Sequence, residues 1–201
     1  MKRCALFTVA VAAAIATYVR CVRRRVLDFG ATATERSASL PGDEIVADAA
    51  IQTTRAITIV APPAAIWPWL VQMGPSPRAG VYTYDWIERR LGIDIANSDR
   101  ILPEFQHLDA GEFFALNKGG TNGLTVRRVD PEQALVLEWT AGSSWAFILL
   151  PEEGSTRLIS RNRIPGGGWK FWLGMVAFME PGSLVMEWKM LRGIKERVER
   201  N

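Results

Sequence analysis

The final stretch of the chain, residues 181–200, restricts the fold more than any other. Pro181 suits the first turn of a helix, where its missing N–H costs nothing. Apolar residues then recur at spacings of three and four, at Leu184, Trp188, Leu191, Ile194 and Val198. The pattern predicts one long helix with a single apolar face, and such a face needs an apolar surface to cover it.

The middle of the chain supplies that surface as short strands. Apolar alternation predicts a first strand over residues 55–61 and later strands over 112–116, 124–129, 134–140, 145–150 and 156–164. Short turns between the later strands favour antiparallel neighbours. Two short helices are predicted over 64–73 and 84–91, and residues 169–178 are compatible with another helix. A long helix across a curved sheet can leave a gap that holds a ligand. Alternatively, the helix packs tightly against the sheet and leaves no cavity.

Several stretches resemble one known superfamily. They are TTRAITIVAPPAAIWPWLVQMG (53–74), RAGVYTYDWIE (78–88), IDIANSDRILPEFQHL (93–108), WAFILLP (145–151), STRLISRNR (155–163) and VMEWKMLRGIKER (185–197). With the element order, they make the chain resemble the START-like, or SRPBCC, helix-grip superfamily of polyketide cyclase-like proteins. Within this superfamily, the sequence of these stretches is similar to that of a largely actinobacterial, membrane-anchored branch.

The resemblance implies an α+β helix-grip fold. In that fold a curved antiparallel sheet wraps around a long C-terminal helix, and two short helices follow the first strand. The cavity between sheet and helix takes lipids, polyketides, hormones or other apolar ligands. The resemblance does not imply one reaction, because members of the superfamily range from carriers to cyclases.

The N-terminus carries an apolar run over residues 4–19, interrupted only by Thr8 and Thr17. As a helix it would be about 24 Å long, against about 30 Å of hydrocarbon in a bilayer. Four arginines follow at Arg20 and Arg23–Arg25. They favour a transmembrane signal anchor over a cleaved signal peptide or a peripheral amphipathic helix, and they place the domain in the cytoplasm.

The predicted organisation has three parts. Residues 1–27 form the anchor with its basic flank, residues 28–52 a linker, and residues 53–201 the START-like domain. We therefore expect a single-pass protein of the inner (plasma) membrane.

The distribution of charge and of metal ligands excludes several functions. Basic residues gather at the N-terminus, and the rest of the chain holds slightly more acidic than basic residues, which argues against nucleic-acid binding. The two cysteines, Cys4 and Cys21, flank the apolar run, and His107 is the only histidine. We expect no metal site of the Cys or multi-His kind, and no cofactor, since no P-loop or dinucleotide motif is present.

Candidate site residues come from four places. An aromatic and polar cluster at the start of the second short helix either orients a ligand or caps the helix. Glu104 and Gln106 lie in a loop, where a carboxylate acts as an acid or base or ties the loop. Arg161 faces either the cavity or the solvent; in the cavity it would pair with Asp85 or Glu104 or bind an anionic head group. The candidate ligand-binding residues are Gln72, Tyr82, Tyr84, Asp85, Trp86, Glu104, Gln106, Arg161 and Trp188.

Three functions are compatible with these patterns. The first is a membrane-anchored binding or carrier domain for an apolar or amphiphilic, lipid-like small molecule. The alternative is a cyclase- or hydrolase-type enzyme that uses Tyr84, Asp85 and Glu104. The third is an accessory subunit of a membrane protein complex, with a filled cavity that serves only stability.

Overall fold

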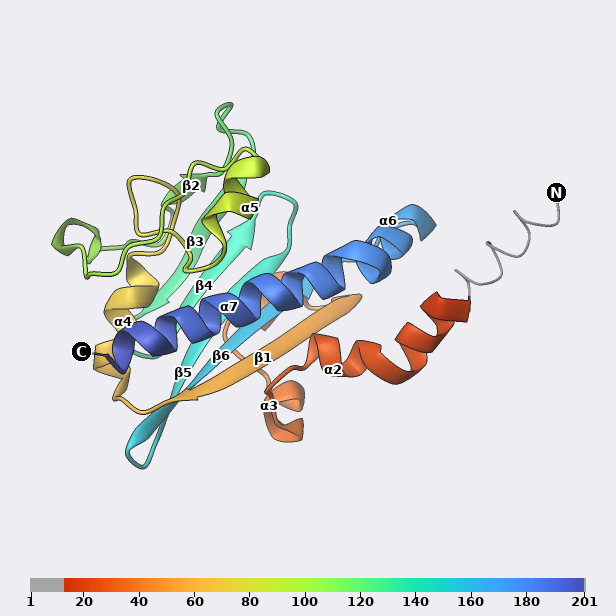
Figure 1. The fold of residues 1–201 in the computed structure, drawn as a ribbon, viewed down its shortest axis with the longest axis horizontal. Coiled ribbons are helices and arrows are strands. Elements are labelled where there is room, and N and C mark those ends of the chain that lie inside the picture. The colour runs from red at the N-terminus through yellow and green to blue at the C-terminus, as the bar shows by residue number, and fades with distance from the viewer. Residues whose placement is uncertain (1–12, 201) are drawn as a thin grey trace.

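The computed structural model describes residues 13–200 as an α+β fold built on one sheet (Figure 1). Six strands are antiparallel in the order β1-β6-β5-β4-β3-β2. Their bounds are Ile51–Ile59 for β1, Phe113–Ala115 for β2, Gly123–Asp130 for β3, Ala134–Trp139 for β4, Ser144–Glu152 for β5 and Ser155–Ile164 for β6. These strands lie within a few residues of the predicted ones, because apolar alternation and short turns identify antiparallel strands well.

Helices occupy the two expected places in the chain. Between β1 and β2 lie α4 (Pro63–Val71), α5 (Asp85–Arg90) and the short 3₁₀ helix η3 (Pro103–Phe105). After β6, α6 (Trp169–Gly174), the π-helical η4 (Met175–Met179) and α7 (Glu180–Val198) follow without a break and cross the sheet (Figure 1). The long final helix and the two short helices after the first strand confirm the predicted helix-grip order.

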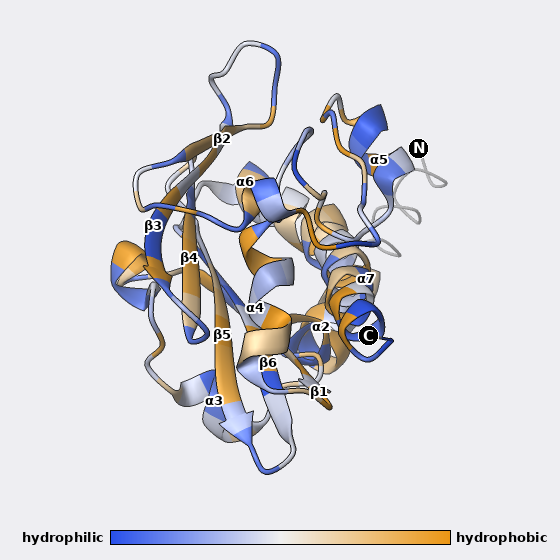
Figure 2. Cartoon of the chain, turned by 90° about the vertical axis from the view of Figure 1, so that its left-hand side faces the viewer, coloured by the Kyte–Doolittle hydropathy of each residue, from blue (hydrophilic) through white to orange (hydrophobic). Residues whose placement is uncertain are grey.

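The sheet has an inner face toward α7 and an outer face away from it, because successive strand residues point in opposite directions. The inner face presents Leu135, Leu137, Phe147, Leu149 and Leu158, which share one core cluster with Leu191 and Ile194 of α7. The outer face presents a second cluster of Val136, Ala146, Ile148 and Ile159. Figure 2 shows β4 and β5 as largely hydrophobic, as expected for strands covered on both faces.

The segment before β1 covers the outer face, which differs from the predicted linker. It contains α3 (Ala33–Ser37) and the 3₁₀ helix η2 (Asp43–Val46). Thr32 and Glu35 form a capping box at the start of α3. Ala31, Leu40 and Ile45 pack against the outer apolar cluster. The segment is too short and too rich in small residues to show a period, so its position depends on partners elsewhere in the chain.

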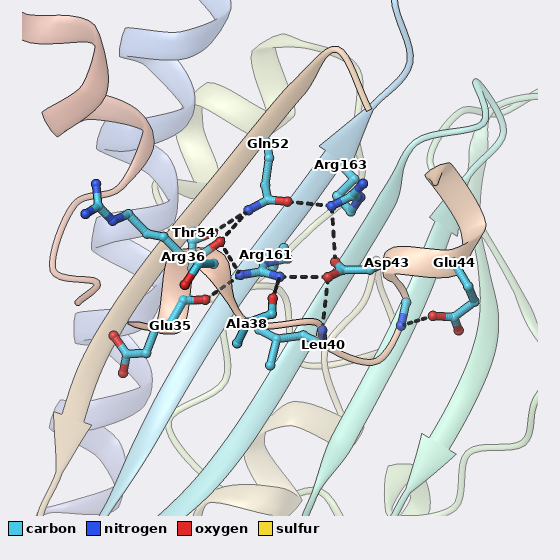
Figure 3. Close-up of polar contacts among 12 residues, drawn as sticks. Glu35, Arg36, Ala38, Leu40, Asp43, Glu44, Gln52, Thr54, Arg161 and Arg163 are labelled. Atoms are coloured by element: carbon cyan, nitrogen blue, oxygen red, sulfur yellow. Dashed lines mark hydrogen bonds and ion pairs between the residues drawn. The ribbon is translucent and has the colours of Figure 1, made fainter. Parts of the chain in front are cut away.

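Arginines of β6 are those partners (Figure 3). Arg161 is 1% exposed and donates to a carboxylate oxygen of Asp43 at 2.8 Å and to the carbonyl of Ala38 at 2.7 Å. Arg157 pairs with Glu35 at 2.6 Å, and Arg163 donates to the carbonyl of Val46 at 2.9 Å. The outward-facing interpretation of Arg161 is therefore right about the face but wrong about solvent exposure, and the cavity-facing interpretation is wrong. Arg161 lies on the outer face, where this segment buries it, and neither Asp85 nor Glu104 is its partner.

The residues just before this segment pack beside the start of α7. They form η1 (Tyr18–Val22) and α2 (Arg23–Leu27). The Arg23 guanidinium contacts the Glu180 carboxylate at 2.7 Å, and the Phe29 ring meets Trp188 edge-on at 4.8 Å. Most of the predicted anchor, residues 4–12, lies outside the described residues. Within residues 13–200, no helix is both long and apolar enough to cross a bilayer.

Candidate functional site: a cavity beneath the final helix

A cavity of about 460 Å³ lies between the inner face of the sheet and the first half of the final helix. Its position follows from how α7 is used along its length. Leu191, Ile194 and Val198 in the second half pack into the core with α4 residues such as Ile66 and Leu70. The first half instead contributes Ser183, Met186 and Glu187 to the cavity lining. There α7 spans the gap between the sheet and the loop before β2.

The lining is mostly apolar and comes from three sources. The sheet contributes Ile51, Thr53, Leu124, Trp139, Ala141, Ser143, Trp145, Asn162 and Ile164. The helical stretch after β6 contributes Phe171, Met175, Met179, Glu180, Ser183, Met186, Glu187 and Met190. The loop between α4 and β2, with α5, contributes Val81, Thr83, Glu88, Ile93 and Ile95, and Leu116 follows β2. Four methionines and two tryptophans make a wall that adapts to different apolar shapes.

Two of the three carboxylates among the described lining residues form ion pairs with arginines. Glu187 pairs with Arg55 of β1, which is 0% exposed. Arg55 also donates to the carbonyl of Val26 at 3.2 Å and to the hydroxyl of Ser183 at 3.0 Å. Glu180 pairs with Arg23. Neither arginine is among the described lining residues.

Glu88 is the third carboxylate and differs from the other two. It is 7% exposed, and its Oε1 accepts a hydrogen bond from the Thr83 hydroxyl at 2.6 Å. Its Oε2 is buried and has no hydrogen-bond partner among the residues that the structure describes. Burial raises the pKa of the Glu88 carboxyl, and the charge of Asp85 raises it further, against the opposing effect of the Thr83 hydrogen bond.

The loop that carries Thr83 and Glu88 is held by one side chain. Asn97 accepts from the backbone N–H of Tyr82 at 2.6 Å and donates to the carbonyl of Thr83 at 2.9 Å. This close approach requires Gly80, whose φ is +71° and where a Cβ would lie 2.5 Å from the Asn97 Oδ1. The loop is thus positioned against the cavity by a short local sequence.

The topology and the cavity together decide the fold family. The chain begins its sheet with β1, continues through α4 and α5 into an antiparallel meander, and ends in a long helix over a cavity. The sequence predicts this arrangement. The chain has the START-like, helix-grip fold.

Comparisons with known proteins find solved structures of low sequence identity. A polyketide cyclase-like protein of Corynebacterium glutamicum, Cgl2372, is 13% identical over 74% of this chain and 91% of its own, with a TM-score of 0.46. Aha1 of Colwellia psychrerythraea is 16% identical over 74% and 96%, with a TM-score of 0.44. Protein NE0264 of Nitrosomonas europaea is 12% identical over 75% and 95%, with a TM-score of 0.47. No protein-family model and no curated protein matches the chain.

None of the nine candidate residues predicted from the sequence lines the cavity of the START-like domain. Three of them form a network of their own. The Gln72 amide donates to the Tyr82 hydroxyl at 2.9 Å and accepts from the Gln106 amide at 3.2 Å, while Tyr82 donates to the carbonyl of Trp69 at 2.9 Å. This network ties α4 to the loops around it.

The other candidate residues lie outside both the cavity lining and this network. Tyr84 and Trp86 are 37% and 65% exposed, and Glu104 is also exposed. Asp85 accepts from the backbone of Asn97 at 3.2 Å. Trp188 faces Phe29. The structure therefore does not bring Tyr84, Asp85 and Glu104 together around the cavity.

Sequence reasoning missed the polar residues that do line the cavity. Within the predicted helix over residues 84–91, the apolar residues Trp86 and Leu91 would be expected inside and Glu88 in solvent, whereas Glu88 is buried and Leu91 is 73% exposed. Charged residues are buried only when partnered, and the partners Thr83 and Arg55 are not recognisable from spacing. Within residues 13–200, no cluster of three or more His, Cys, Asp or Glu side chains is arranged to hold a metal ion.

Proposed function

We propose that this protein binds an apolar or amphiphilic small molecule, lipid-like in size, in the cavity beneath α7. The observation that carries the proposal is a cavity of about 460 Å³ with a predominantly apolar lining. Such volumes are typical of small-molecule sites, whereas a packed core leaves few voids larger than a water molecule. A filled cavity that serves only stability does not fit this volume.

The arrangement of polar groups favours a carrier over an enzyme. Glu180 and Glu187 are held by arginines, so Glu88 is the lining carboxylate with an unpartnered oxygen in the described chain. A single polar pole orients a ligand. Glu88 also supports a second candidate, an acid–base enzyme, because a buried carboxyl with a raised pKa is a common general acid.

Binding of a neutral apolar probe tests the proposal. The full-length protein in phosphatidylcholine nanodiscs should bind N-phenyl-1-naphthylamine with a saturable rise in fluorescence, after subtraction of empty nanodiscs. Ile164→Trp should weaken this binding, because it adds volume at a lining position. Leu150→Trp, at a 40% exposed position of β5, is the matched control. Absence of saturable binding would contradict the proposal.

We also propose that residues 4–19 attach the protein to a membrane, with the folded domain in the cytoplasm. Exposed apolar side chains on α6, η4 and the start of α7 support a membrane-facing end, among them Trp169, Leu173, Phe178, Met179 and Val185. In Figure 1 this end of the molecule is also the end from which the N-terminal helix extends. A ligand drawn from the bilayer would then enter a cavity whose wall includes Phe171 and Met175.

The orientation follows from the arginines after the apolar run. A reporter enzyme that is active only in the cytoplasm, fused after Asn201, should therefore be active in cells. A reporter that is active only outside the cytoplasm should stay silent at the same position. The reverse pair of results would overturn the orientation.

A further inference from the structure

The charged residues among the described cavity lining are all acidic. Among the described residues that line it, three are carboxylates, Glu88, Glu180 and Glu187, and none is Lys, Arg or His. The guanidiniums of Arg23 and Arg55 contact two of these carboxylates but do not line the cavity. A ligand therefore meets carboxylate oxygens and not the positive charges that balance them.

Glu88 differs from the other two lining carboxylates in its hydrogen bonds. Glu187 already accepts from Arg55 and from the Asn162 amide at 3.3 Å, and Glu180 accepts from Arg23 and from the Tyr18 hydroxyl at 3.1 Å. The Oε2 of Glu88 is buried without a partner in the described part of the chain. A buried acceptor without a donor is costly, and a ligand N–H or O–H that reaches it removes that cost.

On the basis of the proposed function, we infer that the cavity selects apolar molecules whose polar end is a positively charged amine, with Glu88 as its counter-ion, and rejects carboxylates and phosphates. An anionic head group would lie beside Glu88 in a medium of low dielectric, and no lysine, arginine or histidine among the described lining residues would pair with it. An ammonium group would instead form a charge-assisted hydrogen bond. A neutral alcohol would gain only an ordinary hydrogen bond and should rank between the two.

Competition among ligands of equal chain length tests this inference. Full-length protein in zwitterionic phosphatidylcholine nanodiscs is loaded with N-phenyl-1-naphthylamine. The dye is then displaced by dodecylamine, dodecanol or dodecanoate below their critical micelle concentrations. Dodecylamine should displace the dye at the lowest concentration and dodecanoate at the highest. Dodecanoate that competes as well as dodecylamine would overturn the inference and leave the proposed function intact. Absence of dye binding would overturn the proposed function itself.

A matched pair of variants assigns the preference to Glu88. Glu88→Gln keeps the shape and an acceptor for Thr83 but removes the charge. It should reduce the preference for dodecylamine over dodecanol, taken as the ratio of their displacing concentrations in the same variant, by about tenfold. Glu153→Gln, at an exposed position of the β5–β6 turn, should leave the preference unchanged. An undiminished amine preference in Glu88→Gln would overturn the role of Glu88, and the competition series on the unmodified protein tests the selectivity even if the variant folds poorly.

Discussion

Arg55→Met should lower the free energy of unfolding by about 3–5 kcal/mol, because it leaves a buried carboxylate without its counter-ion. Arg55 is 0% exposed and connects three elements: it pairs with Glu187 of α7, and it donates to Ser183 of α7 and to the carbonyl of Val26 in α2. Without it, Glu187 keeps only the hydrogen bond from Asn162. Urea denaturation of the full-length protein measures the change.

Two controls separate this ion pair from a general effect of losing an arginine. The double variant Arg55→Met, Glu187→Met removes both charges and should recover much of the loss, because an apolar pair replaces the buried ion pair. Arg127→Met removes an exposed arginine, 52% accessible, from its pair with Glu138, and should cost less than about 1 kcal/mol. A loss in Arg55→Met no larger than in Arg127→Met would contradict the structural role.

Deletion of residues 1–50 should prevent folding instead of releasing an intact domain. It removes the partners of Arg161 on the outer face, Arg23 from Glu180, and the Val26 carbonyl from Arg55. A hydrogen bond to a charged group contributes about 1.5–3 kcal/mol, whereas whole domains are stable by only about 5–15 kcal/mol. The deletion also uncovers the outer apolar cluster around Val136 and Ile148.

Deletion of residues 1–12 is the matched control, because every contact described above remains. Near-ultraviolet circular dichroism and protease resistance compare the two shortened chains. The shorter deletion should keep a cooperative unfolding transition and the longer one should lose it. Equal transitions in both would show that the segment before β1 is dispensable, as expected for the predicted linker over residues 28–52.

The sheet and the final helix could be predicted because their signals are periodic. Alternation places Leu135, Leu137, Phe147 and Leu149 on one face of the sheet, and that face is the one that meets α7. The three- and four-residue spacing likewise identifies Leu191, Ile194 and Val198 as the buried stripe of the helix. In these elements burial follows from local pattern alone.

The cavity could not be predicted in the same way, because its polar residues depend on partners far along the chain. Spacing places Trp188 on the inner stripe, and Trp188 does pack against the inner core cluster, with its ring also against Phe29. Spacing does not show that Met186 and Glu187 line the cavity. Glu187 is tolerated there because Arg55, more than a hundred residues earlier, neutralises it. A search for charged residues on otherwise apolar helix faces would have flagged Glu187 but not its partner.

The central claim is that the space beneath α7 is a ligand site, and the dye titration of Ile164→Trp beside Leu150→Trp tests it most directly. Both variants add an indole to the sheet, but only the first adds it to the cavity lining. We predict that Ile164→Trp raises the dissociation constant of N-phenyl-1-naphthylamine by about tenfold or more, and that Leu150→Trp leaves it unchanged. Equal dye affinity in the two variants, with both folded, would contradict the claim.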